Sequence, residues 1–90
     1  MEISDTIDKT DKFMGTQVGD DLIVYNDVSG NYLGLGETGT AIFGLIDGPV
    51  RISSIMDQLA QSYDVERTVL EADVMSFLDQ LMTHDLIRIV

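Results

Sequence analysis

The chain has 90 residues, of which 44% are hydrophobic and 23% are charged, and this size and composition predict one globular domain with a modest core. Sixteen acidic residues against five basic ones give a formal net charge of -11. This balance argues against nucleic-acid binding, which needs Lys or Arg to contact phosphates. The absence of cysteine excludes disulfides and thiolate metal sites. No apolar run approaches the roughly 18 residues of a membrane span, and the N-terminus lacks the features of a signal peptide, so we expect a cytoplasmic protein without a membrane partner.

The N-terminal third of the sequence predicts strands. Residues 1–11 are rich in carboxylates and poor in apolar side chains, so we expect them to form a flexible acidic arm, with residues 12–90 as the single domain. Two strand-like runs follow, at Phe13–Val18 and residues 22–25, separated by a Gly-Asp-Asp turn. A turn-forming segment that ends in Gly30 leads to a third run at residues 31–35, which completes a three-stranded antiparallel meander.

The apolar spacing then changes to a helical period. It predicts a helix over residues 40–47, a second helix capped by Ser53, and a third, longer helix capped by Asp64. The apolar stripe of the third helix consists of Leu70, Val74, Phe77, Leu78 and Leu81. A short β-branched run at residues 86–90 predicts a final strand. The expected fold is α+β, with a three-stranded antiparallel N-terminal sheet followed by three helices and a short C-terminal strand, as in winged-helix domains.

Residues 34–39 read G-L-G-E-T-G and match the G-x-G-x-x-G pattern of dinucleotide-binding loops. That function needs a second parallel strand after the next helix, whereas this sequence continues with Gly48-Pro49 and another helix. The stretch also lacks the Lys of a phosphate-binding P-loop. We therefore interpret it as a glycine-rich turn in which Gly36 or Glu37 caps a helix, and we expect no cofactor.

No set of residues indicates catalysis or metal binding. His84 is the single histidine, so neither a nucleophile–base pair nor a histidine-centred metal site has its partners. We expect His84 to lie at a helix end, where a positive charge is favourable. The chain is thus predicted not to be an enzyme.

The third helix has two flanks beside its apolar stripe. One flank carries Val69, Ala72, Asp73 and Ser76, and its small residues would let another backbone approach closely. The other flank carries Glu71, Met75 and Met82, and methionine is common at permissive binding surfaces. Both flanks could instead pack on the first two helices, and the sequence leaves open which flank binds a partner.

Several segments together resemble the PqqD-like family. The run from Tyr32 to Phe43 is similar to that family's aromatic strand followed by Leu, then E-T-G before a helix. Residues 45–49, which read L-I-D-G-P, are similar to the family's L-L-D-G-P segment. Residues 63–65 and 73–81 are similar to its Y-x-V and D-V-x-x-F-L-x-x-L segments. Two positions depart from the pattern, because Gly36 stands where the family often has Asn and Asp85 where it often has Gly.

This resemblance implies a winged helix-turn-helix recognition element for ribosomally made precursor peptides. In such domains the precursor's leader adds as a strand to the third strand and lies against the third helix, and a separate maturase (a radical enzyme, a leader peptidase or a cyclase) then acts on the peptide. The leader-binding residues are expected to be Asn31, Tyr32, Leu33, Gly34, Leu35, Val69, Ala72, Asp73 and Ser76. The acidic surface would suit a leader with basic residues.

Three alternatives remain at the level of sequence. A winged-helix DNA-binding regulator would share the fold, although acidic residues on its recognition helix would be repelled by phosphate. A generic protein–protein interaction module would need no peptide substrate. The exposed edge strand also allows either a monomer or a dimer that pairs through that edge.

Overall fold

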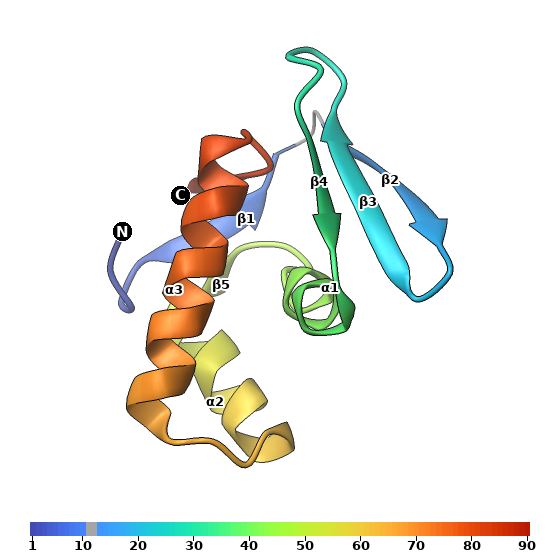
Figure 1. Ribbon diagram of the computed structural model, residues 1–90. Helices are drawn as coiled ribbons and strands as arrows, with labels where there is room; N and C mark the ends of the chain where they lie inside the picture. Colours follow the sequence, from blue (N-terminus) through green and yellow to red (C-terminus); the bar gives the residue numbers. More distant parts are fainter. Residues whose placement is uncertain (11–12) are drawn as a thin grey trace.

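The computed structural model describes residues 1–10 and 13–90. Over these residues it confirms the α+β fold predicted from sequence, with the three-stranded meander, three helices and a C-terminal strand (Figure 1). It also adds two short strands that were not predicted. No helix among the described residues is long and apolar enough to cross a membrane.

The first sheet is an antiparallel meander that we call the wing. Its strands are β2 (Phe13–Val18), β3 (Asp21–Asn26) and β4 (Tyr32–Leu35), with β3 in the centre. Tyr25 faces Tyr32 and Leu22 faces Leu35 across β3 and β4. Gly30 closes this hairpin with a φ of 76°, a conformation that suits glycine, and its N–H donates to the carbonyl of Asn26. β2 and β4 are therefore the two edges of the wing.

The second sheet has β1 (Thr6–Lys9) between β5 (Val50–Arg51) and β6 (Ile87–Ile89). The expectation of a flexible arm was wrong for these residues, because β1 is the central strand and Ile7 is completely buried. The strand is stabilised by pairing with β5 and β6, which are far away in the sequence. Its four residues have no local pattern that predicts this pairing. The predicted boundary between arm and domain, at residues 11–12, lies outside the described residues.

The three helices are α1 (Glu37–Gly44), α2 (Ile52–Ser62) and α3 (Arg67–Thr83). Gly36 is the N-cap of α1, as one of the two predicted alternatives required, but α1 begins three residues before the predicted start at residue 40. The predicted caps Ser53 and Asp64 were wrong. The N-cap residues are Arg51 and Glu66, and neither makes a side-chain capping hydrogen bond. The local capping signal was therefore misleading at both helices.

The core lies between the two sheets and the helices. Ile7 of β1, Val24 of β3 and Ile55 of α2 are fully buried. The stripe predicted for α3 is confirmed at four buried positions, whereas the fifth, Phe77, is half-buried. Its ring reaches the border between the core and the surface beside the wing.

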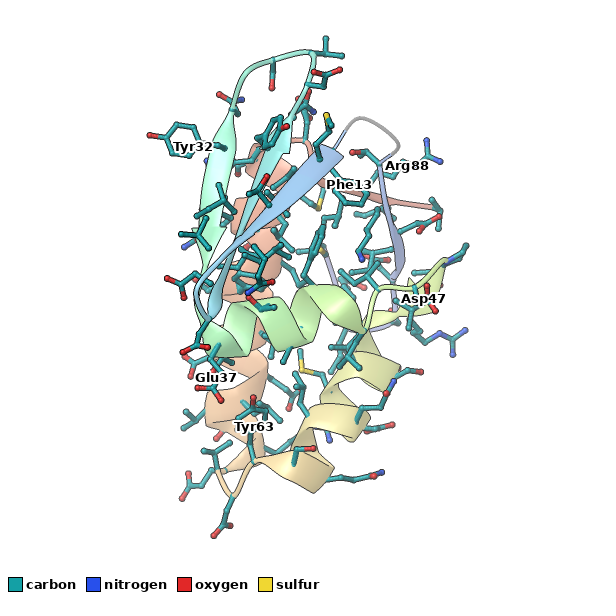
Figure 2. The ribbon with its side chains drawn as sticks, turned by 90° about the vertical axis from the view of Figure 1, so that its right-hand side faces the viewer. Phe13, Tyr32, Glu37, Asp47, Tyr63 and Arg88 are labelled. Atoms are coloured by element: carbon teal, nitrogen blue, oxygen red, sulfur yellow. The ribbon has the colours of Figure 1, made fainter. Side chains whose placement is uncertain are left out.

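Two aromatic rings join the wing to the rest of the domain. Phe13 at the start of β2 points inward and packs edge-on against Phe43 of α1, with 5.4 Å between ring centroids (Figure 2). The Lys9 ammonium lies 4.2 Å from the centroid of Phe43, a favourable cation–π distance. Burial lowers the pKa of Lys9 from its usual value, while the Asp47 and Asp8 carboxylates oppose that shift.

A buried amide holds the wing at its other end. Asn26 is 1% exposed, and its side-chain oxygen accepts the N–H groups of Val28 and Ser29 at 2.9 and 3.0 Å. Its Nδ2 donates to the carbonyl of Asp85 at 3.2 Å, and the Thr10 hydroxyl donates to the same carbonyl at 2.8 Å. Asp85 has a φ of 57°, a left-handed backbone conformation that glycine adopts more readily than other residues.

We expect Asn26→Ala to lower the free energy of unfolding by about 2–3 kcal/mol, because three hydrogen bonds of roughly 1 kcal/mol each are lost in a buried place. Urea unfolding followed by circular dichroism measures this change. Asn31→Ala is the control, since Asn31 is exposed and should change stability by less than about 0.5 kcal/mol. Equal effects of the two substitutions would contradict the role of Asn26.

Candidate functional site

The outer edge of β4 has backbone groups that no other described strand uses. β4 pairs with β3 on one side only. The N–H of Asn26 donates to the carbonyl of Asn31, so residues 31, 33 and 35 direct their backbone groups toward β3 in the alternating antiparallel pattern. Tyr32 and Gly34 therefore direct their N–H and C=O groups away from the sheet. These two donors and two acceptors can pair with an added strand.

Helix α3 lies beside this edge, because β4 is the wing strand nearest to it (Figure 1). The wing and the C-terminal part of α3 approach each other at two places. At one of them a Cβ built at Gly39 of α1 lies 3.0 Å from the Phe77 ring and 3.4 Å from the Cβ of Leu35. At the other Asn26 bonds to Asp85, just after α3. The stretch of α3 from Phe77 to its C-terminal end thus runs alongside β4.

A cavity of about 340 Å³ lies where β4 runs into α1. It is lined by the start of α1, the end of α2, the α2–α3 connection and one side of α3, through Thr38, Gly39, Ile42, Leu59, Tyr63, Val65, Leu70, Asp73, Val74 and Phe77. Most of these side chains are apolar. The free edge of β4 and this cavity together form a surface that we call the edge–cavity site.

The structure distributes the predicted β4 residues between surface and core. Asn31, Tyr32 and Gly34 are exposed, and the Tyr32 side chain, 71% exposed, projects outward from the wing (Figure 2). Leu33 is half-buried and Leu35 is 1% exposed. Since the side chain of Leu35 belongs to the core and its backbone groups face β3, Leu35 is not available to an added strand. Leu35 instead anchors the end of β4 in the hydrophobic core.

The structure also decides between the two flanks of α3. Arg67 pairs with Asp57 of α2 at 3.1 Å and with Glu71 at 3.7 Å, so the Glu71 flank faces α2, and Met75 and Met82 on this flank are packed against the core. The opposite flank is open, since Val69, Ala72, Asp73 and Ser76 are all exposed. This flank borders α1 and the wing through Phe77.

Only one of the predicted α3 residues, Asp73, lines the cavity. Val69 and Ala72 belong to the N-terminal half of α3, before the stretch that runs beside β4. Residues of α1 and of the α2–α3 connection also line the cavity and were not predicted; they include Thr38, Tyr63 and Val65. The sequence had one usable signal, which was Gly39 in the E-T-G turn. From the sequence we interpret these residues only as a glycine-rich turn before a helix, whereas in the structure the Phe77 ring packs closely against the backbone of Gly39.

The edge–cavity site presents backbone donors and acceptors and a largely apolar cavity. Among residues 1–10 and 13–90, no three His, Cys, Asp or Glu side chains come together as metal ligands would. His84 follows α3, and its Nδ1 lies 2.8 Å from the carbonyl of Gln80, where it serves the helix end as predicted. The site therefore offers backbone hydrogen bonds and an apolar cavity with one carboxylate.

We expect Gly39→Ala to destabilise the protein by about 1–2 kcal/mol, because the added methyl group pushes against the Phe77 ring and the wing. Gly44→Ala is a matched control in the same helix, since a Cβ there meets nothing within 4 Å, and it should leave stability unchanged or raise it by up to about 1 kcal/mol. Urea unfolding compares the two. Partial recovery by Phe77→Leu in the Gly39→Ala background would identify the ring as the cause, and equal stability of the two alanine variants would contradict it.

Comparisons with known proteins agree with this architecture. The sequence profile of coenzyme PQQ synthesis protein D (PqqD) matches residues 21–87. The solved structure "TbiB1 in Complex with the TbiA(beta) Leader Peptide" is similar to this chain, with a TM-score of 0.80, 26% sequence identity, and coverage of 90% of this chain and 94% of that chain. A second structure, "Lasso peptide synthetase B1 complexed with the leader peptide", has the same fold with a TM-score of 0.77, 23% identity, and coverage of 91% and 96%. No curated protein sequence matches the chain. Because the profile covers strands β3 and β4 of the wing, β5, all three helices and the start of β6, the chain belongs to the PqqD family.

Proposed function

We propose that this protein is a non-catalytic recognition element that binds the leader segment of a ribosomally synthesised precursor peptide. The observation that carries the proposal is the free edge of β4 beside α3, with the backbone groups of Tyr32 and Gly34 directed outward. A leader in extended conformation adds to this edge as a fourth strand of the wing. Such strand addition obtains affinity from main-chain hydrogen bonds and specificity from side-chain pockets.

Support for a peptide ligand comes from a relative of known structure. TbiB1, which is 26% identical to this chain, was solved with a leader peptide. The edge–cavity site provides the features that a peptide of this kind requires. Beyond Leu35 the added strand reaches the cavity, where an apolar side chain is removed from water and Asp73 lines one wall. Val69 and Ser76 are exposed on the same flank of α3, where the peptide can contact them.

The role of such a domain is to position a substrate for another protein. We propose that the domain presents the bound precursor to a separate maturase, which is a radical enzyme, a leader peptidase or a cyclase. Holding the leader raises the effective concentration of the precursor at the maturase without any bond chemistry in this chain. The free β4 edge can also pair with a second copy, and that dimer would compete with the leader for the same backbone groups.

The first test is a titration with a fluorescein-labelled peptide that carries the N-terminal leader segment of the cognate precursor. We expect saturable binding, followed by fluorescence anisotropy. N-methylation of single peptide amides should weaken binding about tenfold or more at alternate positions only, because every second N–H of an added strand faces β4. Absence of saturable binding contradicts the proposed function, and an effect without this period of two contradicts strand addition.

A second test changes the protein. Gly34→Pro removes an N–H from the free edge of β4 while the ladder with β3 keeps its donors, so leader affinity should fall at least about tenfold with the fold retained. Gly15→Pro is the matched control, because Gly15 occupies the equivalent position on β2, the other edge of the wing. Anisotropy measures affinity, and circular dichroism checks the fold. Equal loss in both variants would show that the wing, rather than the β4 edge, had been damaged.

A further inference from the structure

The wall of the cavity carries one charge. Asp73 is the only acidic or basic residue among the ten that line the cavity, and the others are apolar except for Thr38, Gly39 and Tyr63. Its carboxylate is exposed, and within the described part of the chain it has neither a hydrogen-bond partner nor an ion pair. A carboxylate in this position is available to a ligand that enters the cavity.

Three more carboxylates belong to residues that are next in sequence to lining residues of the cavity. Glu37 precedes the lining residue Thr38, and Asp64 and Glu66 enclose the lining residue Val65. All three are exposed. Glu37 and Tyr63 lie on the same side of the molecule as Tyr32 (Figure 2). The potential around the cavity is therefore negative and attracts a cation.

None of the four basic residues that the structure describes, Arg51 among them, lines the cavity or pairs with Asp73. Arg67 is the nearest in sequence, and it is engaged with Asp57 and Glu71 on the opposite flank of α3. Arg88 lies on the other side of the molecule from Glu37 and Tyr63 (Figure 2). Lys9 packs over the ring of Phe43. The negative charge at the cavity is thus left for a binding partner to complement.

We propose that the edge–cavity site selects a peptide in which an apolar or aromatic side chain enters the cavity and a neighbouring Lys or Arg pairs with Asp73. This inference rests on the proposed function and specifies the chemistry of its ligand. A closed apolar cavity of roughly 150 Å³ suffices to bind benzene, so the cavity of about 340 Å³ can accept an aromatic ring. The cation remains at the rim, where water still reaches it.

The charge contributes specificity more than affinity. An ion pair at an exposed rim changes affinity by about two- to fivefold, and salt screens it. The apolar anchor and the backbone hydrogen bonds supply the remainder of the binding. Peptides that have the anchor and an acidic neighbour should bind more weakly than peptides with a basic neighbour, because the acidic group would face Asp73 and the carboxylates around it.

The test is selection from a displayed library of random twelve-residue peptides on the immobilised full chain. We expect enrichment of an apolar or aromatic residue with Lys or Arg within two positions of it. Asp73→Asn should abolish the basic preference and keep the apolar one, and Asp73→Lys should replace it with a preference for Asp or Glu. Asp79→Lys is the matched control on the same helix, because Asp79 is exposed and does not line the cavity, and it should leave the selected sequences unchanged.

The outcomes separate the two proposals. If no peptide is enriched on the unaltered chain, the proposed recognition function fails. If peptides are enriched but their charge preference is absent, or persists in Asp73→Lys, the inference about Asp73 is overturned and peptide recognition stands. Anisotropy with an enriched peptide should also show a two- to fivefold loss of affinity in Asp73→Asn at low salt, and a smaller loss at high salt.

Discussion

The close packing of the Phe77 ring and of Leu35 against Gly39 brings the wing and the helices together. It joins α3, α1 and the end of β4 at one point, and a Cβ at position 39 would lie only 3.0 Å from the ring. The ring can occupy this place because glycine has no side chain. The separation between β4 and α3, and with it the width of the edge–cavity site, therefore depends on glycine rather than a larger residue at position 39.

The opposite end of the wing is held by polar bonds. Asn26 and Thr10 both donate to the carbonyl of Asp85, so the hairpin and the end of β1 are fastened to the turn after α3. With both ends fixed, the β4 edge is held in position before any ligand arrives. A pre-organised edge loses little entropy on binding, which suits the leader-binding function proposed here.

Backbone and side chains divide the work of recognition in the function proposed here. The groups of Tyr32 and Gly34 can pair with a strand of almost any sequence, because they recognise only its main chain. Discrimination then has to come from the cavity and from Asp73 at its wall. In this proposed function, substitutions at a few positions on α1, α3 and the α2–α3 connection would change which peptide is bound while the backbone pairing stays the same.

The sequence by itself determined the features whose signals are local. Alternating apolar residues and turn glycines predicted the wing strands and β6 to within about one residue at each end. The helical period predicted the buried stripe of α3. The segments of the E-T-G and L-L-D-G-P type indicated the family. The sequence failed at β1 and β5, and at the starts of α2 and α3, where the caps carry no side-chain hydrogen bond. Only the tertiary structure decided that residues 6–9 form a central strand, that the Asp73 flank rather than the Glu71 flank is open, and that α1 and the α2–α3 connection complete the cavity. The physical reason is that each of these depends on contacts between residues far apart in the chain, which leave no periodic trace in the segment that makes them.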